Sequence, residues 1–202
     1  MSGSIAYNPW SDEYQVTFAG KTIETTVTKS ASTITDWINQ IPFNTLTTNQ
    51  VVGLDLEWRP HPVRSMSNTT ATLQLCVDTK CLIVQLFYVD FIPQSLKDFL
   101  SSSAFTFVGV EVADDARKLK SEYGLECNKT DDVRAAAMRK WPYRFRRPGL
   151  KDLAFDLLGL RMDKTKRVTL TDWQAEVLTM DQIQYACIDA YASFRLGHLL
   201  FN

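Results

Sequence analysis

The chain has 202 residues, of which 45% are hydrophobic and 22% are charged, and its formal net charge at pH 7 is −1. This composition is typical of a globular protein with a sizeable core, and we expect one domain over residues 1–202. No apolar run approaches the roughly 20 residues that span a bilayer, and the first residues lack the charged-then-apolar order of a secretory signal. We therefore expect a cytoplasmic protein without a membrane partner, with the nucleus left open.

The small net charge offers no general attraction for nucleic acid, so any attraction for phosphate must be local. A structural zinc site is not expected, because the four cysteines form no Cys-x-x-Cys pair and only two histidines accompany them. Reduced and buried thiols are the interpretation that these residues favour. The cysteines are Cys76, Cys81, Cys127 and Cys187.

The first 48 residues are expected to form a β-hairpin and a helix ahead of a core at 49–202. Residues 14–18 and 22–28 alternate in character around a turn at 19–21. Ser32 or Thr33 is placed to cap a helix that runs to Ile41 and is ended by Pro42.

The core begins with three expected strands, at 51–58, 71–77 and 82–87, with a turn at 78–80 between the second and third. The first of them, VVGLDLEW, is apolar except for two carboxylates, which is typical of a central strand buried on both faces.

The rest of the core alternates one strand with several helices. Pro93 can begin a helix to about Leu100, and Gly124 is placed to stop a helix that opens with Asp114 and Asp115. This order predicts an α/β fold in which helices cover both faces of a mixed sheet. The expected elements are a strand at 105–110 and helices at 114–123, 132–139, 150–158 and 180–200.

Asp55 and Glu57 lie two residues apart in the expected strand 51–58, so both side chains project from the same face. Together they can bind one hard cation. Two like charges in an apolar strand raise each other's pKa unless a cation compensates them. The alternative is that Glu57 ends the strand at the surface, and about one Asp-x-Glu is expected by chance in such a chain.

Three further residues could complete an acidic site. Tyr185 and Asp189 lie four residues apart, on one face of a helix, although an ordinary surface pair has the same spacing. Asp115 follows a buried strand and opens a helix, where an acid can also serve only to favour the helix N-terminus.

These residues lie within longer segments that occur in a characteristic order. The segments are 52–58, then 73–76, then 107–110 with Asp115, 118–119 and 123–125, then 150–153 with 158–159 and 172–173, and last 185–192. In this order they resemble the DEDD superfamily of 3′→5′ exonucleases, in the subgroup whose last motif carries a tyrosine. The similarity extends from about Gln50 to Leu200. It is closest to Werner-type exonuclease domains and, more narrowly, to the small plant proteins that include the RISC-interacting clearing 3′→5′ exoribonuclease.

The resemblance implies a ribonuclease-H-like fold and a nuclease with two Mg²⁺ or Mn²⁺ ions. Asp55, Glu57 and Asp189 would hold the tighter ion, Asp55 would bridge to the second, and Asp115 would reach that second ion. Asp114 is adjacent and Glu111 is close, but the spacing to the Lys118-Leu119 pair fits the family pattern with Asp115 as the acid. Tyr185 would orient the attacking water or assist its deprotonation, and the ordinary phenol pKa near 10 favours orientation.

Substrate contacts are expected in residues 139–147, which interleave five basic residues with three aromatic ones. Single-strand binding uses such a mixture, and a solvated loop or a subunit contact would account for it equally well. Arg144, Arg146 and Arg147 are the candidate phosphate ligands. Trp58 could stack on a terminal base, although core packing is the more usual role for a tryptophan at a strand end.

The resemblance also implies partners that residue patterns do not reveal. It favours single-stranded RNA as substrate, a homo-oligomer such as a hexamer, an Argonaute-containing RISC partner and a role in clearing RNA fragments during small-RNA silencing. Two alternatives stay open: a DNA exonuclease in repair, because the motifs do not read the sugar, and a non-catalytic nucleic-acid-binding scaffold of the same fold.

Overall fold

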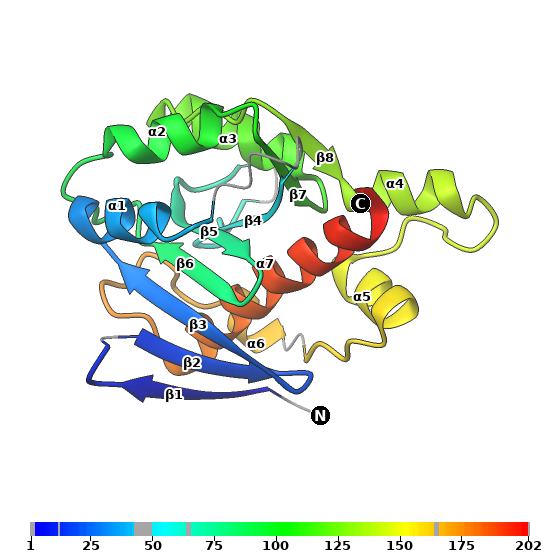
Figure 1. Ribbon diagram of the computed structural model, residues 1–202, viewed down its shortest axis with the longest axis horizontal. Coiled ribbons are helices and arrows are strands. Elements are labelled where there is room, and N and C mark those ends of the chain that lie inside the picture. The colour runs from blue at the N-terminus through cyan, green and yellow to red at the C-terminus, as the bar shows by residue number, and fades with distance from the viewer. Residues whose placement is uncertain (1–2, 12, 43–49, 64–65, 164–165, 202) are drawn as a thin grey trace.

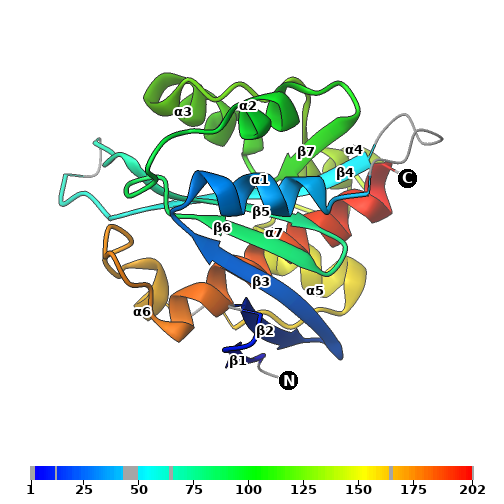
Figure 2. The ribbon, with the colours of Figure 1, turned by 60° about the vertical axis from the view of Figure 1, so that its left-hand side comes forward.

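The computed structural model describes residues 3–11, 13–42, 50–63, 66–163 and 166–201. Within these ranges the chain forms one mixed sheet with helices on both faces, as Figures 1 and 2 show. This confirms the expected α/β class. The expected boundary between the N-terminal part and the core falls at residues 43–49, which lie outside the described residues.

The sheet contains eight strands in the order β1-β2-β3-β6-β5-β4-β7-β8. The β4-β5-β6 segment is an antiparallel meander, as expected, whereas β3 pairs with β6, β4 with β7 and β7 with β8 in parallel. The strands are β1 Ser4–Asn8, β2 Glu13–Phe18, β3 Lys21–Thr28, β4 Gln50–Trp58, β5 Thr70–Val77, β6 Lys80–Val84, β7 Phe105–Gly109 and β8 Thr130–Asp132.

Helices α1, α2 and α3 cover one face of the sheet, and α5 and α7 cover the other (Figures 1 and 2). Among the described helices none is both long and apolar enough to cross a bilayer, and this includes the 22-residue α7. The helices are α1 Ala31–Asn39, α2 Gln94–Ser101, α3 Val112–Tyr123, α4 Val133–Lys140, α5 Leu150–Leu158, α6 Lys166–Thr169 and α7 Met180–Phe201.

Strand β4 divides the core into its two halves. Val52, Leu54 and Leu56 are at most 4% exposed and join the cluster beneath α1, α2 and α3. Val51 belongs instead to the cluster beneath α7, and Gly53 lies directly under that helix. Because side chains alternate along a strand, the odd-numbered residues of β4 face α7.

Helix α1 begins earlier than expected, and the prediction that Ser32 or Thr33 caps it is wrong. The N-cap is Ser30, and the backbone N–H of Ala31 donates to Asp90 Oδ1 at 2.9 Å. A carboxylate 59 positions away therefore satisfies one of the free N–H groups at the start of the helix. The helix ends at Asn39, two residues before the expected end.

Strand β6 is shorter than the expected 82–87. It ends at Val84 because the backbone then turns: the Leu86 N–H donates to the Val84 carbonyl at 3.0 Å, and the Tyr88 N–H donates to the Gln85 carbonyl at 2.9 Å. Strands β1 and β8 and helix α6 were not expected, since each has at most five residues and no strong periodicity. The four cysteines are free thiols and three of them are buried, as expected.

We predict that Gly53→Ala destabilises the protein by about 3 kcal/mol, because its Cβ would collide with the backbone of α7 at Ala190 O and at Phe194 N, the latter 2.7 Å away. Gly149→Ala is the matched control. Its nearest neighbour would be a side-chain oxygen at 3.5 Å, so we expect only the loss of about 1 kcal/mol that alanine causes at the N-cap of α5. Denaturant unfolding of both variants measures the difference, and equal stabilities would contradict close packing of α7 on β4.

Candidate metal centre

Three carboxylates from two distant elements converge on the α7 face of the sheet. Each of Asp55, Glu57 and Asp189 offers an oxygen atom, and these oxygens all lie within 4.8 Å of one another. Asp189 is 3% exposed, and the two β4 carboxylates are half-buried. The period of two along β4 and the packing of α7 above it produce this convergence. The group has the composition and spacing to hold a metal ion.

Strand β5 provides neutral polar neighbours for the two β4 carboxylates. Asp55 is directly opposite Gln74, and Glu57 is directly opposite Thr72, so the four side chains share one face. Gln74 and Thr72 are fully buried, and Gln74 Nε2 donates to Thr72 Oγ1 at 2.6 Å. The sheet beneath the carboxylates is therefore polar and fixed by hydrogen bonding.

Two glycines allow α7 to lie close to the sheet. A Cβ on Gly53 would meet the α7 backbone, and one on Gly197 would lie 2.5 Å from Val108 Cγ2 and 2.7 Å from Val51 Cγ1. Because Gly53 in β4 and Gly197 in α7 both lack a Cβ, the helix can approach β4 and β7 closely. Tyr185 and Asp189 precede these contacts along α7, and Asp189 lies beside Asp55 and Glu57 near the end of β4.

Tyr185 lies one helical turn before Asp189 and is 8% exposed. Its ring centre is 6.1 Å from that of Trp173, which is 1% exposed. Burial is the main cause that raises the Tyr185 pKa above its ordinary value, and the charges of Asp189, Glu57 and Asp55 raise it further. The phenol therefore stays protonated at neutral pH and acts as a hydrogen-bond donor beside the carboxylates.

The segment that carries Trp173 is fastened to α7 by Gln182. Gln182 Nε2 donates to Thr171 Oγ1 at 3.0 Å and to the Asp172 carbonyl at 3.2 Å. Its Oε1 accepts from the Thr179 N–H at 2.9 Å. Sequence reasoning did not identify Gln182, because a glutamine in a helix gives no signal of the loop that it holds.

Asp115 lies in the first turn of α3, outside the group of three carboxylates that the described residues form. Burial first, and then the charges of Asp114 and Glu111, raise its pKa to about 7, while Lys118 lowers it. Asp114 is exposed and pairs with Arg117. Of the two adjacent acids, Asp115 is therefore the one directed toward the interior.

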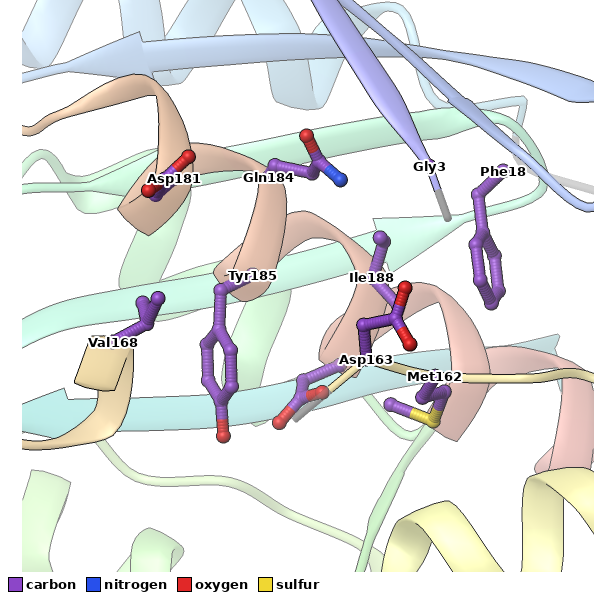
Figure 3. A pocket seen from close by; sticks show the side chains of 10 residues that line it. Gly3, Phe18, Met162, Asp163, Val168, Asp181, Gln184, Tyr185 and Ile188 are labelled. Carbon is purple, nitrogen blue, oxygen red and sulfur yellow. The ribbon is translucent and has the colours of Figure 1, made fainter. Parts of the chain in front are cut away.

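A pocket of about 230 Å³ adjoins Tyr185 and Asp189. Its lining includes Tyr185, Gln184 and Ile188 from α7, and Met162 and Asp163 from the segment that follows α5, as Figure 3 shows. The sequence had not indicated Asp163, which lies in an irregular segment.

The candidate substrate arginines are exposed but differ in their contacts. Arg144 Nη2 donates to the Asp156 carbonyl at 2.8 Å, and Arg147 Nη2 lies 3.7 Å from Glu111 Oε1. Phe145, between them, is 7% exposed and anchors the segment in the core. The structure thus brings Arg147 to Glu111 at the start of α3 and ties Arg144 to α5.

Trp58 packs against the core beneath α1, α2 and α3. Lys118 Nζ lies 5.1 Å from the centre of its ring. The alternation along β4 directs Trp58 away from the face that carries Asp55 and Glu57. Core packing and the cation–π contact account for this tryptophan without a stacked base.

The comparisons with known proteins identify the class. Residues 26–202 match the 3′-5′ exonuclease family. Over 157 residues the chain is 34% identical to an Arabidopsis thaliana 3′-5′ exonuclease, covering 74% of this chain and 52% of that protein. Over 164 residues it is 30% identical to the mouse bifunctional 3′-5′ exonuclease/ATP-dependent helicase WRN, covering 78% of this chain and 11% of that protein. The chain belongs to the 3′-5′ exonuclease family, and it spans about half or less of the length of these relatives.

Two solved structures share the fold. Escherichia coli RNase D aligns with a TM-score of 0.69 at 18% identity, over 87% of this chain and 44% of that one. Brucella melitensis NrnC with bound Mg²⁺ aligns with a TM-score of 0.62 at 21% identity, over 79% of this chain and 76% of that one. These likenesses confirm the expected ribonuclease-H-like fold.

We predict that Gln182→Leu destabilises the protein by about 1–3 kcal/mol, because it removes the hydrogen bonds that the buried Gln182 side chain makes with Thr171, Asp172 and Thr179. Gln184→Leu, two positions along α7 and partly exposed, is the control and should change stability by less than about 0.5 kcal/mol. Thermal and urea unfolding measure both. Equal effects would show that Gln182 does not hold the segment.

Proposed function

We propose that this chain is a metal-dependent 3′→5′ exonuclease of the tyrosine subgroup that removes nucleotides one at a time from a single strand, with RNA preferred to DNA. The observation that carries the proposal is the convergence of Asp55, Glu57 and Asp189 beside a buried tyrosine, in a chain of this family. Family membership alone would also suit a scaffold that has lost its activity. The chain also retains Asp115 and Tyr185, so all five residues of the family's motifs are present. Their retention favours an active enzyme.

The donor set fits a hard divalent cation. All three converging ligands are carboxylates, and oxygen ligands select Mg²⁺ or Mn²⁺. We propose that Asp55, Glu57 and Asp189 hold one ion, and that Asp115 and the shared Asp55 hold a second. When bound, the two ions supply Lewis-acid stabilisation to the attacking and leaving oxygens of an in-line displacement. Support by analogy comes from NrnC, whose structure contains Mg²⁺.

Tyr185 orients the attacking water in this proposal. Its raised pKa keeps the proton on the phenol, so it donates a hydrogen bond and does not remove a proton. Trp173 and the hydrogen bonds of Gln182 hold the ring from behind. In this proposal the carboxylates bind and position the metal ions, and the phenol fixes the direction from which the water attacks.

The substrate and partners are proposed on separate grounds. Arg144, Arg146 and Arg147 are exposed and are proposed to meet the phosphates of the strand, whereas Trp58 is assigned to packing. The resemblance to the small plant exoribonucleases supports RNA, a homo-oligomer such as a hexamer, an Argonaute-containing partner and cytoplasmic clearing of RNA fragments. RNase D, which shares the fold, is an exoribonuclease.

We predict that the purified protein shortens 5′-labelled RNA in single-nucleotide steps and releases labelled mononucleotide from 3′-labelled RNA, only with Mg²⁺ or Mn²⁺ present. Asp55→Ala should lower turnover by more than about 100-fold while preserving the melting temperature, because loss of a direct ligand exceeds the effect of an outer-shell change. Matched DNA strands measure sugar preference. Full activity after exhaustive chelation would contradict the metal mechanism. Faster degradation of DNA than of RNA would favour the alternative of a DNA exonuclease in repair.

We predict that Tyr185→Phe impairs turnover less than Asp189→Ala does, because the first change removes one hydrogen bond and the second removes a metal ligand. Single-turnover rates at saturating Mn²⁺ give the ranking. Only the order is claimed, since residues that act as a unit are not additive. The reverse order would contradict the roles assigned to the two residues.

We predict that changing Arg144, Arg146 and Arg147 together to alanine weakens RNA binding for every sequence and flattens its salt dependence, because fewer counterions are released. The control removes the same charge from exposed lysines elsewhere: Lys21, Lys97 and Lys120. Affinity at several salt concentrations and light-scattering mass are measured for each protein. An unchanged salt slope with an altered mass would assign the arginines to a subunit contact.

A further inference from the structure

The turn that leads into α3 has an unusual backbone conformation. Glu111, the residue before the helix, is left-handed, with φ 61° and ψ 25°. A residue with a Cβ rarely adopts this conformation, and it persists only where the surroundings hold it in place. Four residues later comes Asp115, so the conformation at Glu111 sets the direction in which the first turn of α3 presents that carboxylate.

The backbone of this turn is held by Asp132. Its Oδ2 accepts from the Glu111 N–H at 2.6 Å, and its Oδ1 accepts from the Ala135 N–H at 2.8 Å. One carboxylate therefore joins the start of α3 to the start of α4. Asp132 reaches both because it ends β8, where it is paired with Gly109 at the end of β7.

The side chain of Glu111 joins the same turn to two arginines. Its Oε1 accepts from Arg134 Nη1 at 2.7 Å and lies 3.7 Å from Arg147 Nη2. Arg134, whose side chain is 18% exposed, also donates from Nε to the Pro148 carbonyl at 2.7 Å. The rigid guanidinium fork thus clamps the α3 turn to the segment that carries Arg147.

We propose that Glu111 and Arg134 are positioning residues that aim Asp115 at the metal centre and hold Arg147 beside it. This inference rests on the proposed function for the role of Asp115. Glu111 lies outside the group of three carboxylates that the described residues form, and its Oε1 accepts from Arg134 and is approached by Arg147. Metal binding by Asp115 and phosphate binding by the arginine segment then depend on one shared clamp.

Glu111→Gln tests the clamp, with Asp114→Asn as a charge-matched control. Both acids act on Asp115 through their charge, so either change alters the electrostatics at Asp115 in the same direction. Glu111 and Asp114 are both exposed, but the ion pair of Asp114 with Arg117 stays within α3 and, among the described residues, does not join α3 to another segment. A difference between the two variants therefore isolates positioning from charge.

Three measurements on the full chain are compared: Mn²⁺ binding by calorimetry, the Mn²⁺ dependence of RNA turnover, and hydrogen exchange of residues 112–118. We expect Glu111→Gln to weaken the binding of Mn²⁺ by about 10-fold relative to Asp114→Asn. Turnover should recover at high Mn²⁺, and exchange of 112–118 should accelerate. Equal Mn²⁺ affinities and equal exchange in the two variants would overturn the proposal.

Arg134→Lys and Arg134→Met separate the clamp from general packing. Lysine keeps the charge at Glu111, so we expect it to restore part of the Mn²⁺ affinity that methionine loses. Identical losses in the two would also count against the proposal. If the wild-type protein degrades no RNA, the proposed function fails, but Mn²⁺ binding and hydrogen exchange still decide whether Glu111 and Arg134 position Asp115.

Discussion

The close packing of α7 on β4 at Gly53 is the contact on which the candidate site depends. A Cβ at this position would occupy the space of the α7 backbone, so the helix can reach the strand only because the residue is glycine. The contact fixes the helix along β4. One helical turn then sets Tyr185 relative to Asp189, and the period of two along β4 sets Asp55 relative to Glu57. The carboxylate oxygens meet because these two regular geometries are held in contact.

The electrostatics follow from this packing. Burial is the main cause that raises the pKa of Tyr185 and of Asp115. The charges of Asp189, Glu57 and Asp55 raise the Tyr185 pKa further, and the charges of Asp114 and Glu111 raise that of Asp115. The β5 residues opposite Asp55 and Glu57 are the neutral Gln74 and Thr72, which add no further charge to this face. A divalent cation would compensate the repulsion between the three carboxylates. The site is therefore better suited to binding a metal ion than to holding three uncompensated negative charges.

Local patterns predicted the elements that carry the site but not the contacts that orient them. The alternation in β4 and the four-residue spacing in α7 are visible in sequence because they repeat within one element. The cap of α1 by Asp90 and the ties of Gln182 are not visible, because each joins residues that are distant or irregular in sequence. The short strands β1 and β8 were not predicted for a related reason: they are stabilised by pairing with neighbouring strands and have no strong pattern of their own.

The three acids near the start of α3 are distinguished by their ion-pair partners and their burial, which the sequence does not show. Glu111, Asp114 and Asp115 lie within five residues, and sequence spacing alone leaves the choice among them to a family pattern. The structure separates them by environment: Glu111 meets Arg134, Asp114 meets Arg117, and Asp115 is turned inward, where burial raises its pKa to about 7. An acid paired with arginine is already satisfied as an anion. A metal ligand must be deprotonated, and a cation bound at Asp115 would favour the charged form that burial disfavours there.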